Sequence, residues 1–135
     1  MKLYQQIALQ HNLRGIYNYC CAYCGATDGQ VIYLGNWNSS RRTLYCCVDH
    51  VQTQYNGGSC NIENLQILCN RCNSIKGAYY LPKLEPRQPE YSMLQIIRSQ
   101  IKLQSTMGRR RRTLPDNHIP KTSPLLKEYY SCLNT

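Results

Sequence analysis

A chain of 135 residues with no Phe, one Trp and twelve Tyr can form one domain with a thin apolar core, and its formal net charge of +9 is strongly basic. No apolar run approaches transmembrane length, MKLYQQIALQ at the start lacks the apolar stretch of a signal peptide, and nine cysteines are an odd number for a disulfide framework. We therefore expect a soluble protein of a reducing, cytoplasmic compartment. Its basic charge predicts a polyanionic partner, with nucleic acid preferred over an anionic membrane.

The first predicted elements are one helix, one knuckle and two β-rich runs. Residues 2–13 favour a helix, although their apolar positions fit the helical period loosely. The segment YCCAYCG at 19–25 is typical of a metal-binding knuckle, in which Gly25 lets the backbone fold back toward the metal. Residues 30–35 and 43–48 are rich in β-formers and predict a hairpin or meander.

A polar loop, a short strand and a second helix are expected next. The loop covers residues 51–61 and contains Gly57-Gly58. A strand near Gln66–Leu68 leads into a helix from about Asn70, and Gly77 is a suitable end for that helix.

The last third of the chain reads as a basic, partly helical arm. Three prolines within residues 82–90 indicate a linker, which separates a core at 1–81 from the arm at 91–135. Residues 81–135 carry ten basic and four acidic residues, a net charge of +6. The arm is therefore the more basic part of the chain.

Residues 91–105 predict a helix within that arm. Leu94, Ile97 and Ile101 fall on one apolar stripe, with Arg98 and Lys102 beside it. The stripe suits either packing within the chain or contact with a second copy in a homodimer.

Four cysteines in two pairs predict a structural zinc site. The pattern is C-x₂-C-x₄₄-C-x₂-C, and each C-x₂-C turn offers two sulfur ligands to a tetrahedral ion. The ligands would be Cys21, Cys24, Cys69 and Cys72. The alternative is a set of buried or redox-active cysteines. Buried thiols are the expected state of Cys46 and Cys47.

A second group of residues suits phosphodiester hydrolysis. This chemistry needs a base that activates water and a cation that stabilises the charge on the phosphoryl group. His50 has the appropriate unperturbed pKa for the base and follows Asp49, a hard oxygen ligand for Mg²⁺. Asn73, just inside the predicted helix, offers a neutral oxygen as a second ligand.

The order of these residues resembles the core of the HNH endonuclease family. The resemblance covers about residues 20–78 and includes the segment LYCCVDHVQTQYNGGSCNIENLQILCNRCNSIKG. It implies an α+β protein with the small ββα-metal fold, stapled here by the four-cysteine zinc.

The resemblance also implies a role for each motif residue. His50 resembles the general base, Asn64 the residue that fixes the loop and orients the base, and Asp49 and Asn73 the ligands of one catalytic Mg²⁺ or Mn²⁺. Two positions depart from the common pattern. Asn73 stands where many members have His, and Thr53 stands where Pro often follows the Asp-His pair.

We therefore expect a metal-dependent endonuclease, a hydrolase that cuts DNA and leaves 5′-phosphate and 3′-hydroxyl ends. Double-stranded DNA is the expected partner and RNA remains an alternative substrate. The rival interpretation is a non-catalytic, zinc-stabilised module that binds DNA or RNA. Basic side chains expected to contact phosphates are Arg71, Lys76, Arg109, Arg110, Arg111 and Arg112.

Overall fold

The computed structural model describes residues 1–33, 41–79, 81–89 and 91–107. Its mixture of helices and two small antiparallel sheets confirms the α+β class. In chain order the elements are α1 (Leu3–Gln10), α2 (Leu13–Ile16), β1 (Gln30–Tyr33), β2 (Arg41–Leu44), β3 (Cys46–His50), η1 (Gln54–Asn56), η2 (Ile62–Asn64), β4 (Leu65–Cys69), α3 (Asn70–Lys76) and α4 (Met93–Met107).

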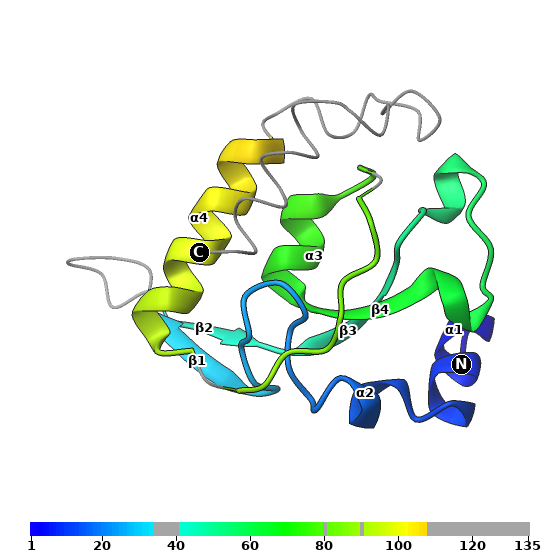
Figure 1. The fold of residues 1–135 in the computed structure, drawn as a ribbon, viewed down its shortest axis with the longest axis horizontal. Helices are drawn as coiled ribbons and strands as arrows, with labels where there is room; N and C mark the ends of the chain where they lie inside the picture. Colours follow the sequence, from blue (N-terminus) through cyan, green and yellow to red (C-terminus); the bar gives the residue numbers. More distant parts are fainter. Residues whose placement is uncertain (34–40, 80, 90, 108–135) are drawn as a thin grey trace.

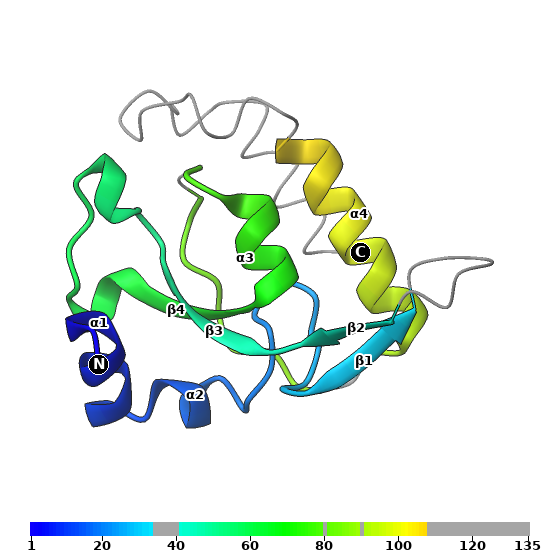
Figure 2. The same cartoon turned by 180° about the vertical axis from the view of Figure 1, so that it is seen from behind.

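Two antiparallel pairs form the sheets. In the first, β1 pairs with β2 so that Gln30 lies opposite Leu44. In the second, β3 pairs with β4 so that Cys46 lies opposite Cys69 and His50 lies opposite Leu65. Helix α3 lies on one side of the β3–β4 pair, and α1 and α2 lie on the other (Figures 1 and 2).

The β-rich run at 43–48 is divided between the two sheets. The break falls at Tyr45, whose backbone N–H and C=O both pair with Asn70 rather than with a strand. Asn70 accepts a hydrogen bond from Tyr45 N at 3.1 Å and donates to Thr43 O at 3.3 Å. Asp28 Oδ1 accepts from Cys46 N at 2.9 Å. The hairpin itself, formed by β1 and β2, agrees with the sequence prediction.

The expected helix at 2–13 is interrupted before its end. Helix α1 stops at Gln10, and Asn12 adopts a left-handed backbone with φ of 52° before α2 begins. A left-handed residue cannot continue an α-helix, so the chain turns at this point. The helix ending at Gly77 was predicted correctly: Gly77 is the C-cap of α3, with φ of 56°.

The core surrounds β4, whose five residues are all buried. Helix α4 contributes to this core through a face formed by Ile96, Gln100, Leu103 and Met107. Of the two roles open to the predicted stripe, Leu94 and Ile101 do not serve packing within the chain, since they are 55% and 56% exposed. Only Ile97 of that stripe packs against the core.

The segment between α3 and α4 is fastened to the core. Leu81 and Leu84 are buried, Leu84 N donates to Gln66 Oε1 at 2.9 Å, and Leu84 O accepts from Tyr17 Oη at 2.7 Å. The described part of the expected arm, α4, shares the core of the residues before it. The division into units at residue 82 stays a prediction. In the described part of the chain, no helix is long and apolar enough to cross a membrane.

Candidate active site and metal centre

Four cysteine sulfurs form a compact, buried cluster. The Sγ atoms of Cys21, Cys24, Cys69 and Cys72 all lie within 4.8 Å of one another, and those of Cys24 and Cys69 are 3.8 Å apart. A tetrahedral zinc with ordinary Zn–S bonds places its sulfurs about 3.8 Å apart. The cluster can therefore bind a metal such as zinc.

Amide groups stabilise the negative charge that such a site collects. In each pair the second cysteine's backbone N–H donates to the first sulfur, from Cys24 to Cys21 at 3.4 Å and from Cys72 to Cys69 at 3.3 Å. Burial raises the pKa of the Cys72 thiol well above its usual range, and the neighbouring thiols raise it further. Four ionised thiols in this space therefore require a cation.

A ligand-supporting residue from α4 was missed in the sequence. Gln100 is 2% exposed, and its Nε2 lies 3.3 Å from Cys69 Sγ and 3.8 Å from Cys24 Sγ. A thiolate that binds a metal can accept a hydrogen bond from an amide N–H. A glutamine within an apolar helical pattern gives no sign of this contact, which depends on how α4 packs. The thiol of Cys46 lies outside this cluster and is buried as expected, whereas Cys47 is only partly buried.

The Asp-His pair and Asn73 line one cleft of about 260 Å³. Asp49 and His50 reach it from the end of β3, and Asn73 reaches it from the first turns of α3. The sequence places Asn73 directly after the last cysteine of the cluster. The start of α3 therefore belongs to both the sulfur cluster and the cleft. The other lining residues are Lys2, Tyr4, Val48, Thr53, Gln54 and Gly77.

Asp49 is buried and both of its carboxylate oxygens have partners. Gln66 Nε2 donates to Oδ2 at 2.9 Å, and Lys76 Nζ lies 3.2 Å from Oδ2 and 3.5 Å from Oδ1. Burial raises the pKa of the Asp49 carboxyl, while Lys76 and Gln66 act in the opposite direction. Oδ1 has the weaker contact and is the atom most available to a cation.

The structure corrects the expectation that Lys76 contacts a phosphate. Its side chain is only 2% exposed, and its ammonium also donates to His50 O at 3.1 Å. Lys76 is therefore an internal partner of the Asp-His segment. A lysine one turn beyond Asn73 reaches β3 because α3 lies against that strand, which the sequence alone does not indicate.

His50 is half-buried at the mouth of the cleft. Burial lowers the pKa of its imidazole below the ordinary value, although the charge of Asp49 opposes the change. The ring meets the ring of Tyr4 edge to face, with centroids 4.8 Å apart. Cys60 Sγ lies 3.6 Å from Nε2. Neither Tyr4 nor Cys60 carries a sequence signal for this position.

Asn64 closes the loop that follows His50. Its side chain accepts from Gln52 N at 2.9 Å and donates to Gln52 O at 2.9 Å and Ser59 O at 2.7 Å. Its own carbonyl accepts from Val51 N at 2.8 Å. The loop also depends on Gly58, where a Cβ would lie 1.7 Å from Gln52 O. These contacts hold the two residues after His50 in place.

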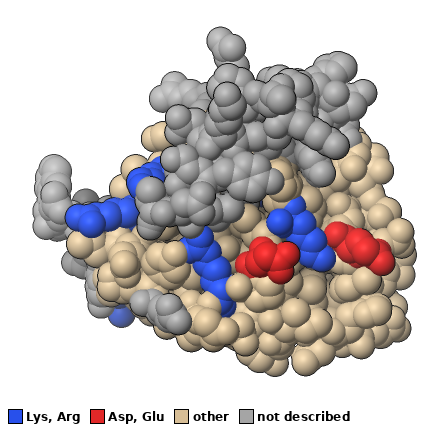
Figure 3. All heavy atoms as spheres, viewed as in Figure 1, with Lys and Arg blue, Asp and Glu red and all other residues tan. Residues whose placement is uncertain are grey.

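On one face of the molecule, acidic side chains separate the described basic ones. On the face shown in Figure 3, Lys and Arg alternate with Asp and Glu. Arg71 is partly buried on α3, and its Nε atom has no hydrogen-bond partner among the described residues. The run Arg109, Arg110, Arg111 and Arg112 lies outside the described residues.

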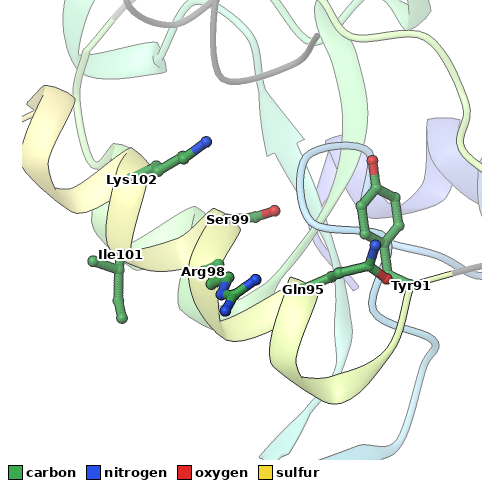
Figure 4. Close-up of a pocket in the computed structure, with 6 residues that line it drawn as sticks. All are labelled: Tyr91, Gln95, Arg98, Ser99, Ile101 and Lys102. Carbon is green, nitrogen blue, oxygen red and sulfur yellow. The ribbon is translucent and has the colours of Figure 1, made fainter. Parts of the chain in front are cut away.

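A larger hollow of about 490 Å³ lies along the outer side of α4 (Figure 4). It is lined by Tyr91, Gln95, Arg98, Ser99, Ile101 and Lys102. Among the residues that the structure describes, this lining contains neither a carboxylate nor a histidine, the groups that metal-assisted hydrolysis needs. The smaller cleft at Asp49 and His50 is the better candidate active site.

The comparisons with known proteins agree with this geometry. No curated protein and no solved structure matches the chain significantly. The model of the HNH endonuclease family matches residues 21–78, a segment that contains the four cysteines and both β3 and α3. Residues 21–78 of this chain are therefore similar to the HNH endonuclease family.

Proposed function

We propose that this protein is a metal-dependent endonuclease that hydrolyses phosphodiester bonds of DNA. The observation that supports it most is the meeting of Asp49, His50 and Asn73 in one cleft, although they come from two elements. A base and two oxygen ligands on one wall are what metal-assisted hydrolysis requires.

Each residue has a separate task in this proposal. His50 accepts a proton from the attacking water, and its lowered pKa keeps the imidazole neutral and able to do so near neutral pH. Asp49 and Asn73 supply oxygen ligands for one Mg²⁺ or Mn²⁺. Such a cation, when bound, stabilises the charge on the phosphoryl and leaving oxygens. Asn64 keeps His50 in line by fixing Val51 and Gln52. Departure of the 3′-oxygen leaves 5′-phosphate and 3′-hydroxyl ends.

Zinc has a structural role in the same proposal. The sulfur cluster joins the knuckle at 21–24 to the start of α3, and Asn73 is the residue after the last ligand. Zinc held by four thiolates has no open position for a substrate. Its effect is to hold the turn of α3 that presents Asn73. Reduced thiols of this kind suit a reducing compartment such as the cytoplasm.

One observation favours the second candidate, a non-catalytic module that binds nucleic acid. The charge of Asp49 is already balanced by Lys76, so the folded protein does not need a divalent cation there. In that case the cleft has the arrangement of residues that resembles the family but does not hydrolyse a phosphodiester bond. The two candidates differ in one measurable respect, which is turnover.

The test is cleavage of plasmid DNA with Mg²⁺ or Mn²⁺, with and without EDTA. We expect metal-dependent cutting by the wild type and a loss of about a hundredfold or more in His50→Ala, the usual effect of removing a general base. His11→Ala is the matched control, since His11 is exposed and does not line the cleft. Equal cutting by His50→Ala would remove His50 from the mechanism. DNA binding without cutting by the wild type would favour the non-catalytic module.

The same assay separates the nucleic-acid substrates and the assembly. Duplex DNA, single-stranded DNA and RNA are offered in parallel, and the ends of the products are sequenced. We propose duplex DNA as the substrate, so faster cleavage of RNA would contradict that part. Nicked product indicates action by one protomer, whereas staggered breaks in both strands indicate a homodimer.

A further inference from the structure

Helix α1 lies outside the segment that matches the family, yet it contributes to the candidate active site. Lys2 and Tyr4 line the same cleft as Asp49, His50 and Asn73. The ring of Tyr4 meets the imidazole of His50 with centroids 4.8 Å apart and an interplanar angle of 65°. This edge-to-face geometry is one of the two arrangements that aromatic rings prefer.

The position of α1 is well determined by packing. Ala8 is 1% exposed, and Tyr4 and Ile7 pack against the same core. Arg14 Nη2 donates to Cys46 O at 3.3 Å, which joins α2 to the first residue of β3. Helix α1 therefore lies close to β3, the strand that ends in Asp49 and His50.

His50 has few other groups that could orient its ring. A catalytic base is usually held by a third group that fixes the direction of its lone pair. In the described part of the chain, the one hydrogen-bond partner found for the imidazole is Cys60 Sγ, at 3.6 Å from Nε2. The edge-to-face contact with Tyr4 is therefore a second described contact that can restrain the ring.

We propose that α1 completes the active site, with Tyr4 as a positioning residue for the His50 imidazole and Lys2 as a phosphate ligand at the cleft. The proposal rests on the proposed endonuclease function. Tyr4 limits the rotation of the ring toward solvent, so that the neutral nitrogen stays directed at the attacking water. Lys2 is exposed, so its ammonium can reach a backbone phosphate of the strand in the cleft.

Three variants test the role of Tyr4. Tyr4→Leu keeps apolar packing and removes the ring, Tyr4→Phe keeps the ring, and Leu3→Ala changes an adjacent side chain that is 61% exposed. We expect Tyr4→Leu to lower kcat about tenfold or more at unchanged KM, because small displacements of a catalytic group are costly in rate. We expect Tyr4→Phe to recover the rate and Leu3→Ala to match the wild type.

A spectroscopic measurement reports the contact independently of cleavage. In protein with ¹³C-labelled histidine, the ring-proton signals of His50 should move in Tyr4→Leu, because the ring current of Tyr4 is removed. They should stay in place in Tyr4→Phe, and the signals of His11 should stay in both variants. A wild-type rate in Tyr4→Leu, or unmoved His50 signals, would overturn the role of Tyr4.

The role of Lys2 is tested by Lys2→Met and its conservative partner Lys2→Arg. We expect Lys2→Met to weaken binding of duplex DNA and to flatten the slope of log K against log salt by about 0.9, the value for one phosphate contact. Lys2→Arg should restore the slope. An unchanged slope in Lys2→Met would overturn the role of Lys2.

The outcomes also separate this proposal from the proposed function. A wild-type protein that cuts no nucleic acid under any metal condition would overturn the endonuclease assignment, together with the catalytic role of Tyr4. A wild-type protein that cuts, with Tyr4→Leu and Lys2→Met cutting and binding equally well, would overturn the role of α1 alone.

Discussion

Asp49 and Lys76 form an ion pair that is almost completely withdrawn from water, with side chains 4% and 2% exposed. Removing one member of such a pair leaves a buried charge without a partner, which typically costs about 3–5 kcal/mol of unfolding free energy. Removing both members costs much less, because no charge is then left buried.

We therefore expect Lys76→Met to be strongly destabilised and the double variant Asp49→Asn/Lys76→Met to recover much of the loss. Urea unfolding of the wild type, the single variants and the double variant measures the coupling. Lys83→Met is the control, since its one described contact is a 3.5 Å hydrogen bond to Ile62 O. A double variant no more stable than Lys76→Met would contradict the buried pair.

His50 predicts a specific dependence of stability on pH. Burial lowers its pKa in the folded protein, so the unfolded chain binds a proton at a higher pH than the folded chain does. The contribution of His50 to stability is therefore present above about pH 6.5 and is lost as the pH falls below that value.

The measurement compares unfolding free energies at about pH 7.5 and about pH 5.5, on either side of the ordinary histidine pKa. We expect His50→Gln to reduce the difference between the two conditions. His11→Gln should leave the difference as it is in the wild type. A difference that is equal in His50→Gln and the wild type would show that His50 titrates normally.

Single residues can be predicted from the sequence where they belong to a local motif. The two cysteine pairs stand at short, recognisable spacings, and the structure brings their sulfurs together. The catalytic roles of the Asp-His pair stay a prediction. Lys76 was misread, because its partner is 27 positions earlier and is reached only when α3 packs on β3. The contact of Tyr4 with His50 likewise depends on tertiary packing alone.

Among the elements, the loop at 51–64 depends on a single asparagine side chain. Asn64 makes three side-chain hydrogen bonds across that loop, whereas the exposed side chain of Asn61 makes no cap hydrogen bond at the start of η2. We expect Asn64→Ala to reduce turnover about tenfold or more, since it releases the residues after His50. Asn61→Ala should keep the wild-type rate.

Zinc content is measured on the same samples and should be equal in both variants, because the loop is separate from the sulfur cluster. Loss of zinc from Asn64→Ala would mean that the whole fold, rather than the loop, had been disturbed.

Helix α4 is coupled to the sulfur cluster through Gln100. Replacing this amide by a carboxylate removes an N–H donor to the sulfurs and places a negative charge beside thiolates that are themselves negative. We expect Gln100→Glu to release zinc to a chelator at least about tenfold faster than the wild type. Gln104→Glu makes the same change at an exposed position one turn later on α4 and should not alter the release. Equal release from both variants would remove Gln100 from the support of the site.

The elements show which sequence signals were sufficient. The strand at 65–69 and the helix from residue 70 were predicted because a short apolar run and a C-terminal glycine are local features. The buried face of α4 was not predicted, because a glutamine occupies its centre. Hydrophobic periodicity assigns a polar residue to the solvent side of a helix. Gln100 is buried in the core because its amide lies beside the cysteine sulfurs.

For the whole molecule, the prediction concerns how nucleic acid is held. The chain has a net charge of +9, and the four arginines at 109–112 form its densest basic run. We propose that the arm at 91–135 supplies affinity rather than chemistry. Replacing the four arginines by Ser should weaken binding at low salt and flatten log K against log salt by about 0.9 for each phosphate that the variant no longer binds.

Cleavage at saturating DNA should be nearly unchanged in the four-Ser variant. Salt-titrated binding and single-turnover cleavage of the two proteins provide the measurement. Equal salt slopes would show that the run makes no phosphate contact. A lower saturating rate with unchanged binding would show that the arm acts within the cleft.

The three segments that enclose the sulfur cluster are far apart in the order of synthesis. Two thiols come from residues 21–24, two from residues 69–72, and the covering amide from residue 100. Domains begin to fold while the chain is still growing from its N-terminus. A nascent chain that ends before α4 already has every ligand but lacks the amide that covers them. We therefore expect a chain that ends before α4 to bind zinc but to release it faster than a chain that includes Gln100.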